Sequence, residues 1–205
     1  MTSFRPATVR TGPTGGFPHR TTIGRVQLAP VTPDRWADFV DLFERRGPRG
    51  GTGPIHCSCM WWRDRASGKG AHERNRRAME ALVRGGGEPG LLAYEDGVAV
   101  GWVSVAPREQ YGQLVRSSRY RLEPEDGVWS IVCFWIDPRA RRKGVAAALL
   151  DGALEHAVSR GAAAVEAFPH RRRPDYMGAE SLYASRGFRP VRDVGPRLIM
   201  RRETP

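Results

Sequence analysis

Several features are scarce or missing in this chain of 205 residues. Cysteine occurs only three times, which is too few for a disulfide framework and agrees with a reducing compartment. No apolar run approaches the roughly 20 residues that span a bilayer. The N-terminus also lacks the apolar core of a secretion signal. These absences predict a protein of the cytoplasm without a membrane partner.

Lysine is scarce as well, because Lys69 and Lys143 are the only lysines among 33 basic residues. The formal net charge of +11 is therefore almost wholly carried by arginine. A solvated basic surface that reflects codon usage is one interpretation, and a field that attracts anions such as phosphate groups is another. No nucleic-acid-binding module and no basic run interleaved with aromatic residues is present. We therefore expect no specific nucleic-acid partner.

The length and composition suit one domain with a substantial core. Hydrophobic residues make up 40% and charged residues 27% of the chain, as in soluble globular proteins. Residues 1–22 mix Thr, Gly, Pro, Arg and His without hydrophobic periodicity, which predicts a disordered basic tail. Residues 23–205 are then predicted to form the single domain.

The most informative stretch runs from residue 128 to residue 157. Residues 128–138 form a β-branched and aromatic run closed by Pro138, which predicts a buried strand. Apolar residues then recur at helical spacing from Ala146 to Ala157. Between them lies a short basic turn with Gly144. Because the first amides of a helix lack intrahelical partners and glycine lets an anion approach them, this turn is predicted to bind a pyrophosphate.

Three segments in this order carry a family resemblance. Arg141, Gly144 and Ala146 give Arg-x-x-Gly-x-Ala, which resembles the acetyl-CoA signature of the GNAT N-acetyltransferase superfamily. The preceding Ile-x-x-Phe-Trp-Ile-x-Pro resembles the fourth strand of that fold, and residues 182–188 resemble its Tyr-x-x-x-Gly-Phe segment. The resemblance implies an α/β (α+β) fold. Its sheet would be mixed, mostly antiparallel, with six to seven strands, about four helices and splayed fourth and fifth strands.

The resemblance also implies acetyl-CoA as cosubstrate and indicates which residues hold it. Pyrophosphate would bind the backbone amides of the turn and of the first helical residues, which are Arg142, Lys143, Gly144, Val145, Ala146 and Ala147. The side chains of Arg141, Arg142 and Lys143 would add positive charge. Pantetheine would fill the gap between the splayed strands and pair with the backbone of Phe134, Trp135 and Ile136. An amide of the same stretch would stabilise the oxyanion.

The catalytic residues are less clearly indicated. Tyr183 matches the tyrosine that many superfamily members use as general acid for the thiolate, although it is also interpretable as a core aromatic residue. Ser130 stands where many members carry an acidic residue. Glu125 and Asp126 lie a few residues earlier and are candidate bases acting through water, or else solvated carboxylates. His56 is a further candidate base.

Residues 55–63, Ile-His-Cys-Ser-Cys-Met-Trp-Trp-Arg, allow three interpretations. A metal site is disfavoured because Cys-x-Cys is tighter than the usual zinc knuckle and no second ligand pair follows, so we predict no metal. The tryptophans are interpretable as core packing. In the superfamily this region borders the acceptor pocket, which makes substrate contacts of the following residues the third interpretation: His56, Cys57, Trp61 and Trp62.

Local patterns predict the remaining elements. They indicate a strand at 25–29, a helix from Thr32 to Arg45, a helix at 72–84, and a hairpin at 91–105 around Asp96 and Gly97. A parallel strand at 162–167, a short helix at 178–186 and a final hairpin follow.

The predicted function is an N-acetyltransferase that moves the acetyl group of acetyl-CoA to a primary amine, preferably of a small molecule, by direct attack on the thioester. A protein N-terminal or lysine acetyltransferase is an alternative. An inactive acyl-CoA-binding module is another, because the fourth-strand acid is missing. The sequence leaves a homodimer open.

Overall fold

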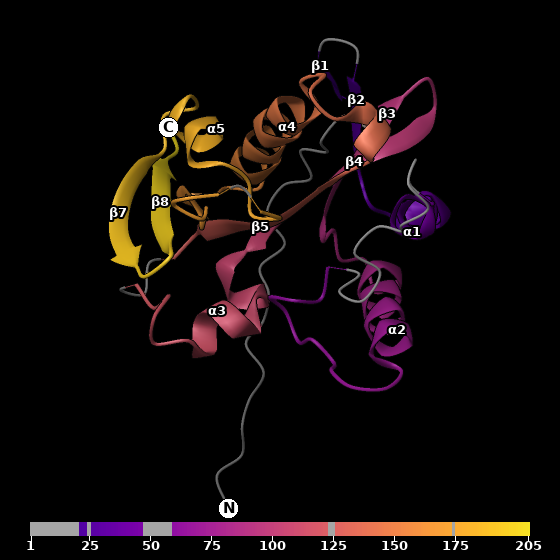
Figure 1. Cartoon of the computed structure of the whole chain (residues 1–205), viewed down its shortest axis with the longest axis horizontal. Helices are drawn as coiled ribbons and strands as arrows, with labels where there is room; N and C mark the ends of the chain where they lie inside the picture. Colours follow the sequence, from indigo (N-terminus) through magenta and orange to yellow (C-terminus); the bar gives the residue numbers. More distant parts are fainter. Residues whose placement is uncertain (1–20, 24–25, 47–58, 123–125, 174) are drawn as a thin grey trace, which may run out of the picture.

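In the computed structural model of the protein, one mixed β-sheet organises the described residues, which are 21–23, 26–46, 59–122, 126–173 and 175–205 (Figure 1). Within these ranges eight strands pair in the order β1-β2-β3-β4-β5-β6-β8-β7. Only β5 and β6 are parallel to each other. The strands are β1 Thr21–Ile23, β2 Val26–Pro30, β3 Gly90–Glu95, β4 Val98–Pro107, β5 Val128–Ile136, β6 Ala164–Ala167, β7 Arg189–Val194 and β8 Arg197–Glu203.

Helices cover both faces of this sheet. The described helices are α1 Trp36–Glu44, α2 Ala71–Arg84, α3 Gly112–Arg116, α4 Val145–Ser159 and α5 Glu180–Ala184, with 3₁₀ turns η1 Pro33–Arg35, η2 Arg108–Gln110 and η3 Pro138–Ala140. The long α4 packs on one face, whereas α1 and α2 pack on the other (Figure 1). None of the described helices has the length and apolar character needed to cross a membrane.

The predicted fold class is confirmed, and most of its local elements are found close to their expected ranges. The hairpin turns at Asp96 and Gly97, whose φ values of 49° and 77° are those of a tight two-residue turn. The helix start at Thr32 was wrong. The Thr32 hydroxyl donates to Asp34 (2.5 Å) instead of capping a helix, so a 3₁₀ turn comes first and α1 begins at Trp36.

The predicted boundary between tail and domain stays a prediction. Residues 1–20 lie outside the described residues. Thr21 and Thr22, which were assigned to the tail, pair with β2 as part of β1.

The close packing of α4 on the sheet depends on Gly101 in β4. A Cβ atom at this position would lie 2.9 Å from the Val145 side chain and 3.0 Å from that of Leu149. The pairing of β3 with β4 shifts register beside this glycine, and glycine within a strand often accompanies such a bulge. The absence of a side chain therefore fixes how near the first turns of α4 come to the sheet.

The splayed strands are also confirmed. Pairing of β5 with β6 ends at Ile131 and Ala167, although β5 continues to Ile136. The N–H of Asp137 donates to the Val100 carbonyl of β4 (2.9 Å). Backbone groups alternate in direction along a strand, so the N–H and carbonyl of Trp135 also point toward β4. Those of Phe134 and Ile136 point the other way, into the gap that opens where β6 no longer pairs with β5.

We predict that the fold loses stability in mild acid because of His156 on α4. Burial, helped by Arg160, lowers the pKa of His156 to about 4 and outweighs a carboxylate oxygen of Glu88 that lies 3.7 Å from its Nε2. The unfolded chain binds the proton near pH 6.5, so the free energy of unfolding should fall by about 3 kcal/mol between pH 6.5 and 4.

Denaturant titrations at several pH values measure this fall. In His156→Gln, which stays neutral throughout, the fall should be smaller by the same amount. An identical pH dependence in both proteins would rule out His156 as its source.

Candidate active site

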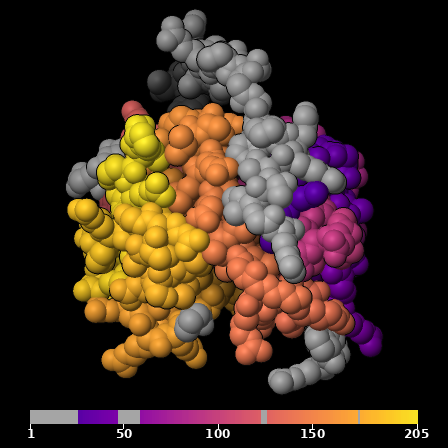
Figure 2. Space-filling view, turned by 90° about the horizontal axis from the view of Figure 1, so that it is seen from above, coloured from indigo at the N-terminus to yellow at the C-terminus, as the bar shows by residue number. Residues whose placement is uncertain are grey.

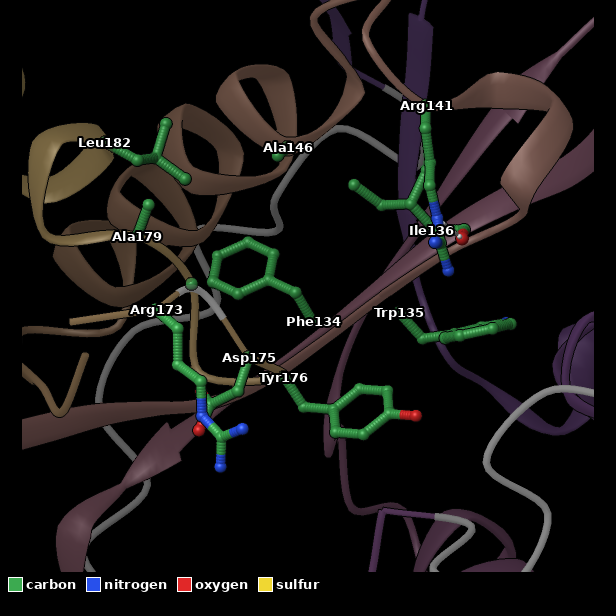
Figure 3. Close-up of a pocket in the computed structure, with 11 residues that line it drawn as sticks. Phe134, Trp135, Ile136, Arg141, Ala146, Arg173, Asp175, Tyr176, Ala179 and Leu182 are labelled. Carbon is green, nitrogen blue, oxygen red and sulfur yellow. Dashed lines mark hydrogen bonds between the residues drawn. The ribbon is translucent and has the colours of Figure 1, made fainter. Parts of the chain in front are cut away.

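A pocket of about 740 Å³ opens where β5 and β6 part. Figure 3 shows its lining: one wall comes from the end of β5, another from the turn and start of α4, and a third from residues 173–182. The lining residues are Phe134, Trp135, Ile136, Arg141, Ala146, Arg173, Asp175, Tyr176, Gly178, Ala179 and Leu182. In Figure 2 the orange turn and helix α4 lie beside the yellow C-terminal segment on this side of the molecule.

Two of the four backbone groups that face the gap are already bonded. The Phe134 N–H donates to the Tyr176 carbonyl (2.5 Å), and the Arg141 Nε donates to the Ile136 carbonyl (3.1 Å). The Phe134 carbonyl and the Ile136 N–H remain directed into the gap. A ligand strand with one donor and one acceptor would match this pair.

This geometry corrects one part of the pantetheine prediction. The backbone of Trp135 pairs with Trp102 in β4, so it is turned away from the gap. Trp135 contributes its side chain to the pocket instead, with its ring 5.3 Å from the Arg141 guanidinium and 6.2 Å from the Tyr176 ring. The sequence pattern identified the strand but not the direction of each backbone group.

The first amides of α4 have no side-chain cap. Asp137 accepts a hydrogen bond from the Arg139 N–H (2.9 Å) and shapes the turn, and Arg142 has a φ of 61°. Gly144 is the N-cap residue with a φ of 84°, and it offers no side-chain cap to the first amides of α4. A Cβ at Gly144 would meet nothing within 4 Å, so glycine is required by the backbone angle and the space stays open. Uncapped helix amides beside basic side chains are the features expected of an anion site, and the predicted binding of pyrophosphate here stays a prediction.

Tyr183 lies behind the pocket wall and not in it. It is fully buried, its hydroxyl donates to the Met177 carbonyl (2.8 Å), and its ring packs edge-on against Phe134 and Phe188. Burial raises the pKa of Tyr183 well above its usual value, so the phenol keeps its proton. A Cβ on Gly178, which lines the pocket, would lie 3.1 Å from the hydroxyl. One glycine therefore separates the Tyr183 hydroxyl from the pocket, and its catalytic role stays a prediction.

Of the candidate bases, Ser130 is buried and Asp126 is exposed, while Glu125 lies outside the described residues. The Ser130 hydroxyl has no hydrogen-bond partner among the described residues. Its register neighbour on β6 is Glu166, which is fully buried and forms ion pairs with Arg108 (2.7 Å) and Arg201 (3.6 Å). Sequence reasoning missed this carboxylate, although a glutamate within an apolar strand was a visible signal.

The tryptophans of residues 55–63 do not line the pocket. Trp61 is 48% exposed and stacks under the Arg65 guanidinium at 3.6 Å, whereas Trp62 packs edge-on against Tyr120. His56 and Cys57 lie outside the described residues, so their predicted substrate contacts stay predictions. Among the described residues no three potential ligands gather as a metal site would require, and the predicted absence of metal also stays a prediction.

Cys59, which comes from the same stretch as Trp61, is buried against the sheet. Its Sγ lies 3.2 Å from the Sγ of Cys133 on β5 and accepts the indole N–H of Trp102 (2.6 Å). Cys59 therefore packs directly on the face of β4 and β5 that is opposite to α4. Only the tertiary structure shows this contact, because the two cysteines are distant in sequence.

The parted strands of the mixed sheet and the glycine turn before α4 are the features that the resemblance to GNAT acetyltransferases implied. The family model for the Acetyltransferase (GNAT) family matches residues 57–188, which is more than half of the chain. The chain belongs to this family and is thus an acetyl-CoA-dependent N-acetyltransferase, as its sequence predicted.

Solved structures share the fold at low sequence identity. The PaiA N-acetyltransferase from Thermoplasma acidophilum in complex with coenzyme A is 14% identical, with a TM-score of 0.51, and the match covers 87% of this chain and 99% of that one. For YncA from Salmonella typhimurium with acetyl-CoA the values are 15%, 0.53, 88% and 94%. For a ribosomal-protein-alanine N-acetyltransferase from Brucella melitensis they are 16%, 0.51, 86% and 99%. No curated protein sequence matches the chain.

Proposed function

We propose that the protein transfers the acetyl group of acetyl-CoA to the primary amine of a small molecule by direct attack on the thioester. The observation that carries this proposal is the pocket between β5 and residues 173–182, which is continuous with the turn at the start of α4. A phosphate-binding turn at one end and a parted sheet at the other fit a long ligand with an anionic end.

The cofactor-binding residues follow from this arrangement. The amides from Arg142 to Ala147 face the pyrophosphate, and the charges of Arg141, Arg142 and Lys143 neutralise it in part. The Phe134 carbonyl and the Ile136 N–H are the groups that pair with pantetheine. Either the Ile136 N–H or the Phe134 N–H, once released from Tyr176, stabilises the oxyanion of the tetrahedral intermediate.

Proton transfer is assigned to two groups. We propose that Tyr183 protonates the departing thiolate, which requires its hydroxyl to leave the Met177 carbonyl and reach past Gly178. Burial raises the pKa of Tyr183, so the phenol carries its proton in the resting enzyme, as a proton donor must. For the amine, we propose Glu125 acting through water as the base, and Ser130 on β5 as a further catalytic residue.

The choice of a small acceptor is supported by the segment after β6. Asp175 is held by an ion pair with Arg197, and the next residue, Tyr176, places its carbonyl on the Phe134 N–H. This segment crosses the gap and narrows it, whereas a peptide acceptor needs an open groove. The neighbours named above include a ribosomal-protein-alanine N-acetyltransferase, so an acceptor on a protein is the alternative.

Two measurements test the proposal. Isothermal titration should detect binding of acetyl-CoA, and a panel of small amines should release free coenzyme A thiol in proportion to acetylated product. Binding without transfer to any amine or peptide N-terminus would favour the inactive module. Transfer to peptides but not to small amines would favour the protein acetyltransferase. Absence of binding would refute the whole assignment.

A further inference from the structure

Arg63 is a buried cation without a buried counterion in the part of the chain that the structure describes. The residue is only 6% exposed, and no carboxylate oxygen of the described residues lies within 4.0 Å of its guanidinium. Other largely covered arginines are paired with acids: Arg108 with Glu166, Arg197 with Asp175, and Arg45 with Asp137. Arg63 is therefore an exception to the pattern of this protein.

Neutral groups hold the guanidinium in place. It donates to the Gln110 side chain (3.0 Å) and the Pro89 carbonyl (3.5 Å), and it lies 4.6 Å from the centre of the Tyr111 ring. Its Nε is buried and has no hydrogen-bond partner among the described residues. A buried unpaired charge is costly, and the planar fork of arginine matches a carboxylate. Among the described residues no anionic group offsets this charge, so the arrangement suits an anionic ligand.

The position of Arg63 connects it to the pocket. Tyr111, on which it stacks, has its hydroxyl 3.0 Å from the Ser104 hydroxyl of β4, and Ser104 lies opposite Cys133 of β5. Cys133 directly precedes Phe134, whose backbone faces the gap. Cys133 packs with Trp135 on the side of the sheet that is opposite to α4.

A thioester that enters from the start of α4 would emerge through the gap on the side of Trp135 and Tyr176. The Arg63 guanidinium is linked to this side of the sheet through Tyr111, Ser104 and Cys133. An acceptor amine at the thioester can therefore be part of a molecule whose other end reaches Arg63.

We propose that Arg63 binds the carboxylate of the acceptor, so that the acceptor is an amino acid or a similar small molecule that carries both an amine and a carboxylate. Gln110 and Tyr111 position the guanidinium for this contact. The inference rests on the proposed acetyl transfer to a small amine and names the chemical class of that amine.

The test uses matched acceptors that differ only in the carboxylate. Histidine and histamine, tyrosine and tyramine, phenylalanine and phenethylamine, and lysine and cadaverine form such pairs, and release of coenzyme A thiol gives kcat/KM for each. The carboxylate-bearing member of at least one pair should be preferred by about 100-fold or more, because a site built to bind a polar group rejects analogues that lack it.

Substitution of Arg63 then separates recognition from folding. In Arg63→Gln the preference should be lost, mainly through a higher KM for the carboxylate-bearing member, while activity on its partner and affinity for acetyl-CoA stay the same. Arg63→Lys should restore part of the preference, because the charge returns without the fork. Arg65→Gln, which removes an arginine stacked on exposed Trp61, is the matched control and should keep the preference.

Each other result overturns the inference. Equal use of both members of every pair would exclude carboxylate recognition. An equal loss of both activities in Arg63→Gln would assign Arg63 a structural role. If acetyl-CoA binds but no amine is acetylated, calorimetry on the coenzyme A complex should still detect these amino acids in the parent protein and not in Arg63→Gln, and absence of that binding contradicts the inference. Failure to bind acetyl-CoA would instead refute the proposed function.

Discussion

Gly144→Glu is expected to weaken acetyl-CoA binding by at least about 100-fold, because like charges brought together cost several kcal/mol and each 1.4 kcal/mol is a factor of ten. The new carboxylate would stand at the N-cap of α4, beside the amides that we assign to the pyrophosphate. The space around Gly144 is open, so the side chain fits without a clash inside the protein. Isothermal titration with acetyl-CoA measures the effect.

Two control variants separate charge from backbone strain. Gly144→Gln has the same size and the same unfavourable φ without the charge, and it should lose much less affinity. Gly195→Glu places a glutamate at a φ of 77° in the turn between β7 and β8, where a Cβ also meets nothing within 4 Å, and it should bind acetyl-CoA normally. Unchanged affinity in a folded Gly144→Glu protein would overturn the phosphate site.

Tyr183→Phe is expected to lower kcat by about 10²–10⁴-fold on an identified acceptor, because it removes a proton donor for the leaving thiolate. Acetyl-CoA affinity should change little, since the hydroxyl acts on charge that develops only in the transition state. The ring packing against Phe134 and Phe188 is kept in this variant. Steady-state kinetics with free thiol detection gives the result.

Loss of a buried hydroxyl costs stability by itself, so Tyr94→Phe is the matched control. The Tyr94 hydroxyl donates to Asp38 (2.8 Å) in another part of the sheet, and its removal should leave kcat unchanged. Full turnover in Tyr183→Phe would return Tyr183 to the role of a core aromatic residue bonded to the Met177 carbonyl. Water or the substrate would then supply the proton.

The candidate site was only partly predictable from the sequence. The turn at Gly144 and the stretch from Phe134 to Ile136 were identified, because a strand, a basic glycine turn and a helix follow one another directly. The part of the pocket wall made by Tyr176 was not identified. Nothing in the local sequence indicates that the Tyr176 carbonyl reaches the Phe134 N–H. The predicted contacts of Trp61 and Trp62 with the acceptor were equally beyond the reach of local sequence. Local composition does not reveal which aromatic ring faces a pocket.

The sequence alone determined most elements of this protein and their order. Periodicities of two and 3.6 residues, together with the turn at Asp96 and Gly97, act between neighbours in the chain and fix strands and helices. The tertiary structure decided that β5 and β6 part after Ile131, that Glu166 lies beside Ser130, and that no described carboxylate reaches Arg63. These outcomes depend on register and packing between distant segments, where a shift of one residue reverses the direction of every side chain and backbone group, and local preferences do not encode that choice.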